Sequence, residues 1–287
     1  MARRKPPTTH GLAVVDKPAG VTSHDVVGML RRQFEERQVG HAGTLDPDAT
    51  GVLLVGVGKV TRLLRFLTAL GKTYTGEVVL GTTTSTLDAA GDVTGAFDMS
   101  SVTVDMARTA AADHLTGRIL QIPPMVSALR VGGKRLHELA REGVEVERAA
   151  RPVTVYSFDV AASGDPSVLK IEVRCSAGTY IRSLADDLGR LLGGGAHLRN
   201  LRRTAVGSFG EAEARPPVEC ELIAPIDALR DYPCVVVEGG AIDMVRHGRV
   251  LDRFAGDGPW AVADSDGTLL AVYESFGAVA KPAVVIA

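Results

Sequence analysis

Neighbouring pairs of strand-like segments, with helical segments interspersed, are the feature of this chain that most restricts its fold. Residues 153–161 and 168–175 alternate apolar and polar side chains, which is the period of a half-buried strand. Residues 72–80 have the β-branched and aromatic content of a strand, and residues 196–206 are predicted as another. The pattern predicts an α+β fold, with helices flanking a mixed and largely antiparallel central sheet.

Helix-capping residues predict where two of the helices begin. Thr22 is expected to cap a helix over residues 23–34, because Asp25 stands three residues later, as in a capping box. Thr179 is expected to cap a helix that ends near residue 192. The remaining expected elements are helices over 59–70, 105–115 and 136–142, strands over 12–15, 52–55 and 118–122, and a long Thr-, Gly- and Asp-rich loop over 82–101.

Three parts are expected along the chain. Residues 1–9 are predicted to form a flexible basic tail, residues 10–231 a large domain, and residues 232–287 a small β-rich domain. The last part contains a predicted hairpin around Ser265-Asp266-Gly267. A unit of about 55 residues is close to the lower size limit for independent folding, so we expect it to pack on the large domain.

Composition excludes several classes of protein. Hydrophobic residues make up 45% of the 287 positions, which is enough for a packed core. The three cysteines lie far apart without a C-x-x-C pair, so neither a disulfide framework nor a zinc site is predicted. Neither a secretory signal nor a membrane-spanning apolar run is present, and a cytoplasmic protein is expected. Gly71-Lys72-Thr73 lacks the earlier glycine of a P-loop, so no nucleotide cofactor is predicted.

Charge is distributed unevenly along the chain, although the net charge is only −2. Residues 31–72 contain seven basic and four acidic side chains, and residues 170–203 contain seven and three. Residues 232–287 reverse the balance, with four basic and seven acidic. The two basic stretches fit a local phosphate-binding surface, and equally an unevenly charged solvated surface.

One carboxylate, Asp46, stands in the glycine-rich segment Gly40-His41-Ala42-Gly43-Thr44-Leu45-Asp46-Pro47-Asp48-Ala49-Thr50-Gly51. Pro47 favours an extended backbone at Asp46, and the glycines permit sharp turns or the close approach of a ligand. A carboxylate fixed at a loop–strand junction is a candidate chemical centre, and an ordinary Asp-Pro surface turn fits the segment equally well. Asp48 is too close in sequence to serve as the second carboxylate of a glycosidase pair.

Two further clusters carry groups suited to a flat ligand or to a phosphate. Tyr180 and Arg182 fall at the start of the predicted helix after Gly178, where arginine stabilises a carboxylate and tyrosine flanks a ring. Leu201 is followed by two cations, Arg202 and Arg203, as a base pocket beside a phosphate track requires. Each cluster by itself also fits an ordinary surface.

Taken together, the segments resemble bacterial TruB-type tRNA pseudouridine synthases in their order and spacing, over roughly residues 10–230. The segments are 16–23, the Gly-x-Leu-Asp-Pro-x-Ala-Thr-Gly motif at 43–51, 72–74, 178–189 and 196–203. Asp48 departs from the family, in which an apolar residue is common. The C-terminal part resembles a PUA-type RNA-binding module in His247-Gly248-Arg249-Val250 and in the hairpin after Trp260.

The resemblance implies the pseudouridine synthase fold and the isomerisation of the T-loop uridine at tRNA position 55, with neither cofactor nor metal. It assigns the essential aspartate to Asp46, which attacks the sugar, attacks the base or removes a sugar proton. Arg182 is implied as the partner of Asp46, and Tyr74 as the ring that stacks on a flipped-out uridine. It further implies His41, Tyr180 and Leu201 as substrate-binding residues, and Lys59, Arg62, Arg202 and Arg203 as contacts to the RNA backbone. The implied partner is the tRNA T-stem-loop, bound by a monomer.

Two other functions use the same residues. A non-catalytic RNA-binding or RNA-folding protein predicts that Asp46→Asn leaves the biological role intact. A glycoside or nucleoside hydrolase that uses Asp46 predicts free uracil or free sugar as its product.

Overall fold

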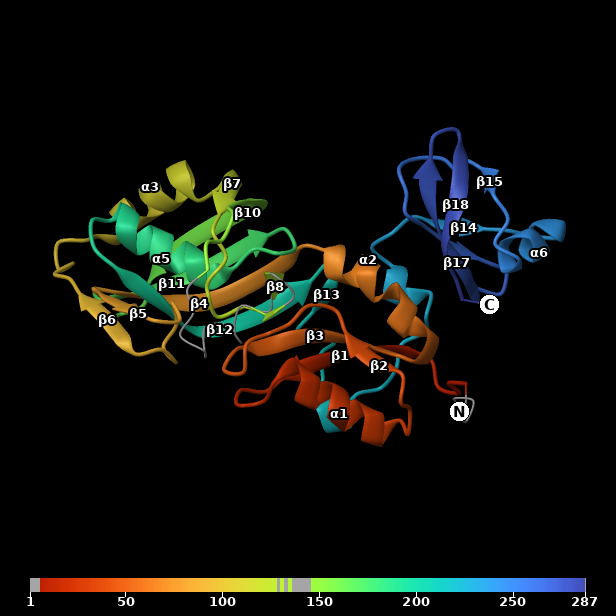
Figure 1. The fold of residues 1–287 in the computed structure, drawn as a ribbon, viewed down its shortest axis with the longest axis horizontal. Coiled ribbons are helices and arrows are strands. Elements are labelled where there is room, and N and C mark those ends of the chain that lie inside the picture. Colours follow the sequence, from red (N-terminus) through yellow and green to blue (C-terminus); the bar gives the residue numbers. More distant parts are fainter. Residues whose placement is uncertain (1–5, 128–129, 132–133, 136–145, 287) are drawn as a thin grey trace. The chain divides into compact units, whose positions relative to one another are not determined.

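The computed structural model describes residues 6–127, 130–131, 134–135 and 146–286. The chain divides into two compact units, and most of their helices and strands are labelled in Figure 1. Unit 1 comprises residues 1–47, 51–70 and 205–287, and unit 2 comprises residues 48–50 and 71–204. Unit 2 is therefore nearly continuous in sequence, whereas unit 1 is assembled from three separate segments.

Unit 2 is built on a sheet whose strands lie in the order β12, β4, β11, β10 and β7. Their bounds are β12 (Ala196–Val206), β4 (Lys72–Leu80), β11 (Val168–Cys175), β10 (Arg151–Ala162) and β7 (Gly117–Gln121). Strand β11 is antiparallel to both β4 and β10, and β10 is antiparallel to β7. Buried and half-buried residues alternate along β4, as its sequence predicts.

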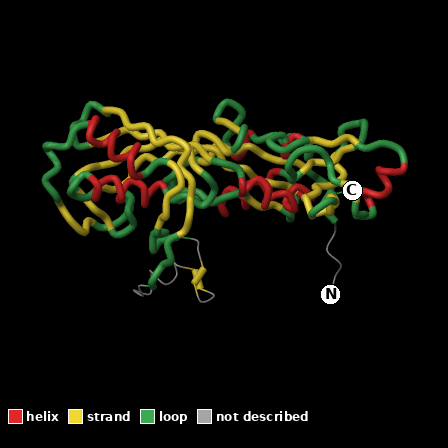
Figure 2. The backbone as a smooth tube through the Cα atoms, turned by 90° about the horizontal axis from the view of Figure 1, so that it is seen from above, coloured by secondary structure: helices red, strands yellow, loops and turns green. Residues whose placement is uncertain are grey.

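Two helices cover one face of this sheet, α3 (Val104–His114) and α5 (Ile181–Leu191) (Figures 1 and 2). Thr103 caps α3 by accepting a hydrogen bond from the Met106 amide. Helix α5 turns its apolar stripe toward the sheet, which buries Ile181, Leu184 and Leu188. The start of α5 is thereby fixed beside the ends of β7 and β11.

The prediction of an irregular loop over residues 82–101 is wrong. Strands β5 (Thr82–Thr84) and β6 (Val93–Ala96) pair there as an antiparallel hairpin. The hairpin packs against Gly194 and Gly195, where an added Cβ would lie 2.7 Å from the Met99 sulfur and 2.4 Å from a Thr83 methyl group, respectively. Two short strands, β8 (Arg130–Val131) and β9 (Lys134–Arg135), form another pair. The helix predicted over 136–142 lies outside the described residues.

The N-terminal segments of unit 1 form three antiparallel strands and a helix. They are β1 (Gly11–Lys17), α1 (Ser23–Gln33), β2 (Val39–His41) and β3 (Thr50–Val57), with β1 and β2 both paired to β3. The capping box predicted from Thr22 and Asp25 is confirmed. The helix predicted over 59–70 begins as a 3₁₀ helix, η1 (Gly58–Leu63), and becomes α-helical only in α2 (Leu64–Ala69).

The C-terminal segment of unit 1 is β-rich, as predicted. After β13 (Phe209–Gly210), η2 (Pro217–Glu219) and η3 (Asp227–Leu229), five strands pair in the order β14, β16, β17, β18 and β15. Their bounds are β14 (Cys234–Val236), β15 (Leu251–Asp252), β16 (Trp260–Ala263), β17 (Leu269–Phe276) and β18 (Val279–Val285), with helix α6 (Gly240–Arg246) after β14. The predicted hairpin is formed by β16 and β17.

One hydrophobic cluster joins this C-terminal sheet to the N-terminal segments of unit 1. Leu54 and Phe66 belong to the same cluster of buried residues as Val272 and Ile286. The C-terminal sheet also has a smaller core of its own around Trp260. The α+β class with a largely antiparallel sheet is confirmed, and the domain boundary at residue 231 stays a prediction.

Candidate active site

Asp46 lies in the loop between β2 and β3, within the glycine-rich segment identified from the sequence. Gly43 and Gly51 have positive φ angles of 92° and 101°, which residues with side chains rarely adopt. The two glycines therefore provide the bends that their positions predict. Asp46 is half-buried, so part of it stays accessible to a ligand.

The backbone is held on both sides of Asp46. Before it, the buried Ser23 hydroxyl accepts a hydrogen bond from the Leu45 amide (2.9 Å) and donates one to the Leu45 carbonyl (3.2 Å). After it, the Pro47 carbonyl accepts hydrogen bonds from the Lys17 ammonium (2.9 Å) and from the Gly20 amide (3.0 Å). The carboxylate is thus carried by a segment anchored at both neighbouring residues.

Lys17 is a positioning residue within segment 16–23, and the sequence alone assigned it no role. It is fully buried, and its ammonium also donates to the carbonyls of Pro18 (2.8 Å) and Val21 (2.7 Å). Its three carbonyl acceptors belong to two loops, one after β1 and one before β3. A buried lysine must satisfy its donors internally, and this one does so by joining the two loops.

Tyr74 and Leu201 lie on neighbouring strands of unit 2. Tyr74 is on β4 and only 9% exposed, and Leu201 is half-buried on β12. Gly76 lies tightly against β12, because an added Cβ would lie 3.3 Å from the Leu198 side chain. His41, by contrast, is half-buried on β2 in unit 1. Their substrate-binding roles stay predictions.

Tyr180 stands at the N-cap of α5, so the prediction that Thr179 caps this helix is wrong. The Thr179 hydroxyl instead donates to the Ser176 carbonyl. The side chain of Gln121, only 2% exposed, binds the Tyr180 backbone twice. It accepts from the Tyr180 amide (2.7 Å) and donates to the Tyr180 carbonyl (3.0 Å), which fixes this residue against the end of β7.

Arg182 is 5% exposed and is held by groups of unit 2. Its guanidinium donates to the carbonyls of Thr86 (2.9 Å) and Val126 (2.8 Å). A carboxylate oxygen of Asp88 lies 3.4 Å from the same guanidinium. Sequence reasoning missed Asp88, which lies in the turn of the hairpin that it took for a loop. The pairing of Arg182 with Asp46 stays a prediction.

Asp88 is itself held in place. The Thr86 hydroxyl and the Ala90 amide both donate to its other carboxylate oxygen. On the backbone, the flanking residues Leu87 and Ala89 exchange hydrogen bonds with Leu198 on β12. The hairpin turn therefore presents a fixed carboxylate to Arg182.

The four predicted RNA-backbone cations have different environments. Lys59 and Arg202 are half-buried. Arg62 is exposed, and its guanidinium donates to the Val285 carbonyl of β18. Arg203 is only 1% exposed, so the prediction that it contacts an RNA phosphate requires correction. A side chain buried within the protein is not accessible to a phosphate.

Arg203 belongs instead to a buried group of polar side chains on the central sheet. Lys72 is 6% exposed and stands opposite Cys175 in the register of β4 and β11. Burial, and the nearby positive charge of Arg203, lower the pKa of Lys72 to about 8. Burial raises the pKa of the Cys175 thiol to about 11.

Among the described residues, no group of three or more His, Cys, Asp or Glu is placed to hold a metal ion.

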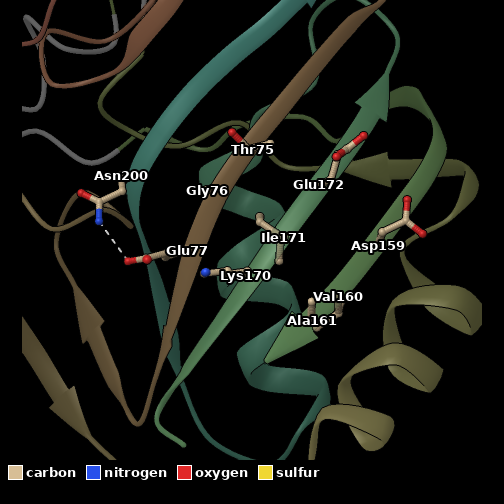
Figure 3. A pocket seen from close by; sticks show the side chains of 10 residues that line it. All are labelled: Thr75, Gly76, Glu77, Asp159, Val160, Ala161, Lys170, Ile171, Glu172 and Asn200. Carbon is tan, nitrogen blue, oxygen red and sulfur yellow. Dashed lines mark hydrogen bonds between the residues drawn. The ribbon is translucent and has the colours of Figure 1, made fainter. Parts of the chain in front are cut away.

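The exposed face of the unit 2 sheet has a shallow depression of mixed charge (Figure 3). Glu77 accepts hydrogen bonds there from Arg199 (2.7 Å) and Asn200 (2.9 Å), and the Arg199 bond is the main reason that its pKa is lowered. Asp159 and Glu172 stand opposite each other on β10 and β11. Two adjacent carboxylates make this face unsuited to an RNA backbone.

In the described part of the chain, no helix is long and apolar enough to cross a membrane.

Comparison with known proteins gives consistent matches. A family model described as TruB family pseudouridylate synthase (N terminal domain) matches residues 31–181, and one described as tRNA pseudouridylate synthase B C-terminal domain matches residues 182–217. The chain is 45% identical to tRNA pseudouridine synthase B of Mycolicibacterium paratuberculosis, over 96% of this chain and 97% of the relative. It is 47% identical to the Corynebacterium aurimucosum protein of the same name, over 93% of each chain.

A solved structure extends these matches to the fold. The crystal structure of a Cbf5-Nop10-Gar1 complex matches with a TM-score of 0.75 at 26% identity, over 96% of this chain and 85% of that chain. A structure of an H/ACA RNP bound to a substrate RNA containing 2'-deoxyuridine shares the fold, with a TM-score of 0.72.

Proposed function

The chain belongs to the TruB family of pseudouridylate synthases, and from this membership we propose that it modifies the T-loop uridine at position 55 of tRNA. It is an isomerase that converts uridine in tRNA to pseudouridine. The proposed substrate is the T-stem-loop, bound by a monomer in the cytoplasm, where tRNA is used.

The observation that carries the proposal is the anchored Asp46 loop. Two hydrogen bonds between Ser23 and Leu45, together with those from Lys17 and Gly20 to Pro47, fix the backbone on both sides of the carboxylate. A group held in this way does not have to be ordered when the substrate arrives, which lowers the barrier to reaction. We assign to Asp46 the essential carboxylate of the reaction.

The isomerisation breaks the N1–C1′ bond of uridine, turns the base and forms a C5–C1′ bond, after which C5 loses its proton and N1 gains one. Asp46 must be ionised to act as a nucleophile or a base, and we assign to the Arg182 guanidinium the role of stabilising that charge. The uridine has to leave the base stack to reach the carboxylate. Tyr74 is assigned to stack on the flipped base, with Tyr180 and Leu201 lining the same pocket and His41 filling the vacated space.

Release of tritium from [5-³H]uridine in the T-loop tests the proposal. We expect release by the native chain and none by Asp46→Asn, which keeps the size of the side chain but loses its negative charge. Binding of tRNA by the variant, measured by filter retention, should stay within about twofold of the native value. Asp48→Asn is the matched control, and it should release tritium at the native rate.

The two other functions predict different results. A hydrolase would release free uracil, which chromatography of the products would detect. A non-catalytic RNA-binding protein would bind tRNA and release no tritium with either chain. Either result would contradict the assignment of an isomerase acting through Asp46.

A further inference from the structure

Strand β12 contains an irregularity directly before Leu201. Leu198 is 1% exposed and lies against the buried face of β4, because a Cβ added to Gly76 would be 3.3 Å from its side chain. Arg203 is also 1% exposed, and its charge lies close enough to the buried Lys72 of β4 to lower the pKa of that ammonium. Leu198 and Arg203 therefore face the same side of the sheet, although two residues separated by an odd number of positions belong on opposite faces of a regular strand.

The additional residue that causes this change lies at Arg199 and Asn200, which are consecutive and both exposed. Asn200 has a φ angle of 53°, in the left-handed region that residues with side chains rarely adopt. Two consecutive residues on one face of a strand, one of them left-handed, are the features of a β-bulge. The bulge shifts the alternation by one residue, so that Leu201 faces the same side as Leu198.

Glu77 of β4 holds this bulge from the exposed face of the sheet (Figure 3). One of its carboxylate oxygens accepts a hydrogen bond from the Arg199 guanidinium (2.7 Å) and another from the Asn200 side-chain amide (2.9 Å). A single carboxylate on the neighbouring strand thus binds both residues of the bulge. Asparagine is also one of the few residues other than glycine that tolerate the left-handed conformation. The residue type and the Glu77 contact therefore stabilise the same local geometry.

We propose that Asn200 is a positioning residue for the isomerisation, because its left-handed backbone directs Leu201 to the side of the sheet that carries Tyr74. Regular alternation after Leu198 would direct Arg202 to that side and would turn Leu201 to the solvent. The inference rests on the proposed function, in which Tyr74 stacks on the flipped uridine and Leu201 lines the same pocket. Bulges occur next to active sites because they re-aim a side chain in this way. Asn200 acts through Leu201, since its own side chain lies on the opposite face.

Substitutions at Asn200 test the left-handed backbone. Glycine adopts this conformation freely, alanine disfavours it, and β-branched valine disfavours it most. In single-turnover tritium release we expect Asn200→Gly to stay within about twofold of the native rate, Asn200→Ala to lose roughly threefold and Asn200→Val roughly tenfold or more. Asn200→Ala gives the same test with a smaller effect if circular dichroism shows that the valine variant does not fold.

Glu35→Val is the matched control for backbone strain. Glu35 is exposed and left-handed, with a φ angle of 50°, and it lies in unit 1 just after the end of α1. We expect this variant to lose about as much in melting temperature as Asn200→Val, while it releases tritium at the native rate. Equal losses of rate in the two variants would mean that reduced stability alone slows the reaction, and they would overturn the inference.

A double-mutant cycle with Leu201→Ala tests whether Asn200 acts through Leu201. Leu201→Ala alone should lower the rate of tritium release. Adding Asn200→Val should then lower the rate by less than about a further twofold, because the side chain that Asn200 positions has already been removed. Rate losses that multiply in the double variant would show that Asn200 acts by another route, which contradicts the inference.

The outcomes separate this inference from the proposed function. A native rate of tritium release by Asn200→Val, together with a lowered melting temperature, would overturn the positioning role and leave the proposed function in place. If the native chain released no tritium from any tRNA, the proposed function would fail, and the positioning role would fail with it.

Discussion

At the scale of single residues, the candidate site is organised by side chains that bind backbone. Ser23 and Lys17 hold the chain on either side of Asp46, and Gln121 holds the backbone of Tyr180. Arg182 in turn donates to two backbone carbonyls. Each proposed catalytic or substrate-binding group among these is therefore oriented before substrate binds, which is how enzymes reduce the entropy lost in reaching the transition state.

Asp88 provides a test of this organisation. Asp88→Asn keeps an oxygen for the hydrogen bonds from Thr86 and Ala90 but removes the charge facing Arg182. We expect kcat to fall about 10- to 100-fold through misplacement of the guanidinium, with little change in tRNA affinity. The readout is single-turnover tritium release. Asp92→Asn, an exposed change in the same hairpin, is the control, and equal rates for the two variants would contradict the role given to Asp88.

Lys72 gives the protein a pH dependence of stability. Its folded pKa of about 8 lies below the unfolded value of 10.5, so above pH 8 the unfolded chain binds more protons than the folded chain. Stability contributed by this residue therefore rises with pH through this range. Between pH 8 and 9 Lys72 should contribute a gain of about 1 kcal/mol, which the buried thiols oppose in part.

Urea unfolding of the native chain and of Lys72→Met at pH 8 and 9 measures this effect. The native chain should gain more stability than the variant over this interval. Parallel changes in the two proteins would mean that Lys72 keeps an ordinary pKa. The raised pKa values of Cys175 and Cys220 act in the opposite direction over the same interval, but both proteins contain these thiols, so the difference between the two proteins reports Lys72.

At the scale of elements, regular strands were predictable and the hairpin beside the site was not. Strand β4 has the predicted bounds, Lys72–Leu80, and its buried and half-buried residues alternate. The position of Tyr74 on this strand was therefore predictable. The β5–β6 hairpin is short and polar, and it is stabilised by packing on glycines about one hundred residues away in sequence. The local sequence pattern does not show contacts between residues so far apart in the chain. Asp88 was therefore missed together with its hairpin. Lys17 was missed because buried lysines are rare and its acceptors are loop carbonyls.

Gly195 provides a test at this scale. An added Cβ would lie 2.4 Å from a Thr83 methyl group and 2.8 Å from the Phe97 ring, so Gly195→Ala should displace the hairpin and Asp88 with it. We expect a loss of about 1–3 kcal/mol in unfolding free energy, together with a lower kcat. Gly28→Ala on α1 is the control, because open space surrounds it, and it should stabilise the protein by up to about 1 kcal/mol. A native kcat in Gly195→Ala would show that the position of the hairpin does not affect catalysis.

At the scale of the whole molecule, the C-terminal sheet is part of the architecture of unit 1. Its Val272 and Ile286 share a buried cluster with Leu54 and Phe66, and Arg65 forms an ion pair with Glu274 (2.9 Å). The sequence predicted that so small a segment would pack on the rest of the chain. It did not predict the hydrogen bond from Arg62 to the Val285 carbonyl, because hydrophobic periodicity does not show which distant strand packs against a helix.

Removal of residues 232–287 tests this packing. The shortened chain would expose the apolar side chains of β3 and α2, so we expect it to aggregate or to melt well below the intact protein. Light scattering and calorimetry measure the two outcomes. A soluble shortened chain with the native melting temperature would show that the C-terminal sheet adds nothing to the stability of unit 1.

The division of the chain into one nearly continuous unit and one assembled from three segments has a consequence during protein synthesis. Unit 2 is complete once residue 204 has left the ribosome, whereas unit 1 needs strands that end at Val285. At about 5–20 residues per second, translation of the intervening segment takes roughly 4–16 s. The strands that flank the Asp46 loop wait through that interval with their apolar faces uncovered. The nascent chain should therefore need chaperone protection at its beginning until its end has been made.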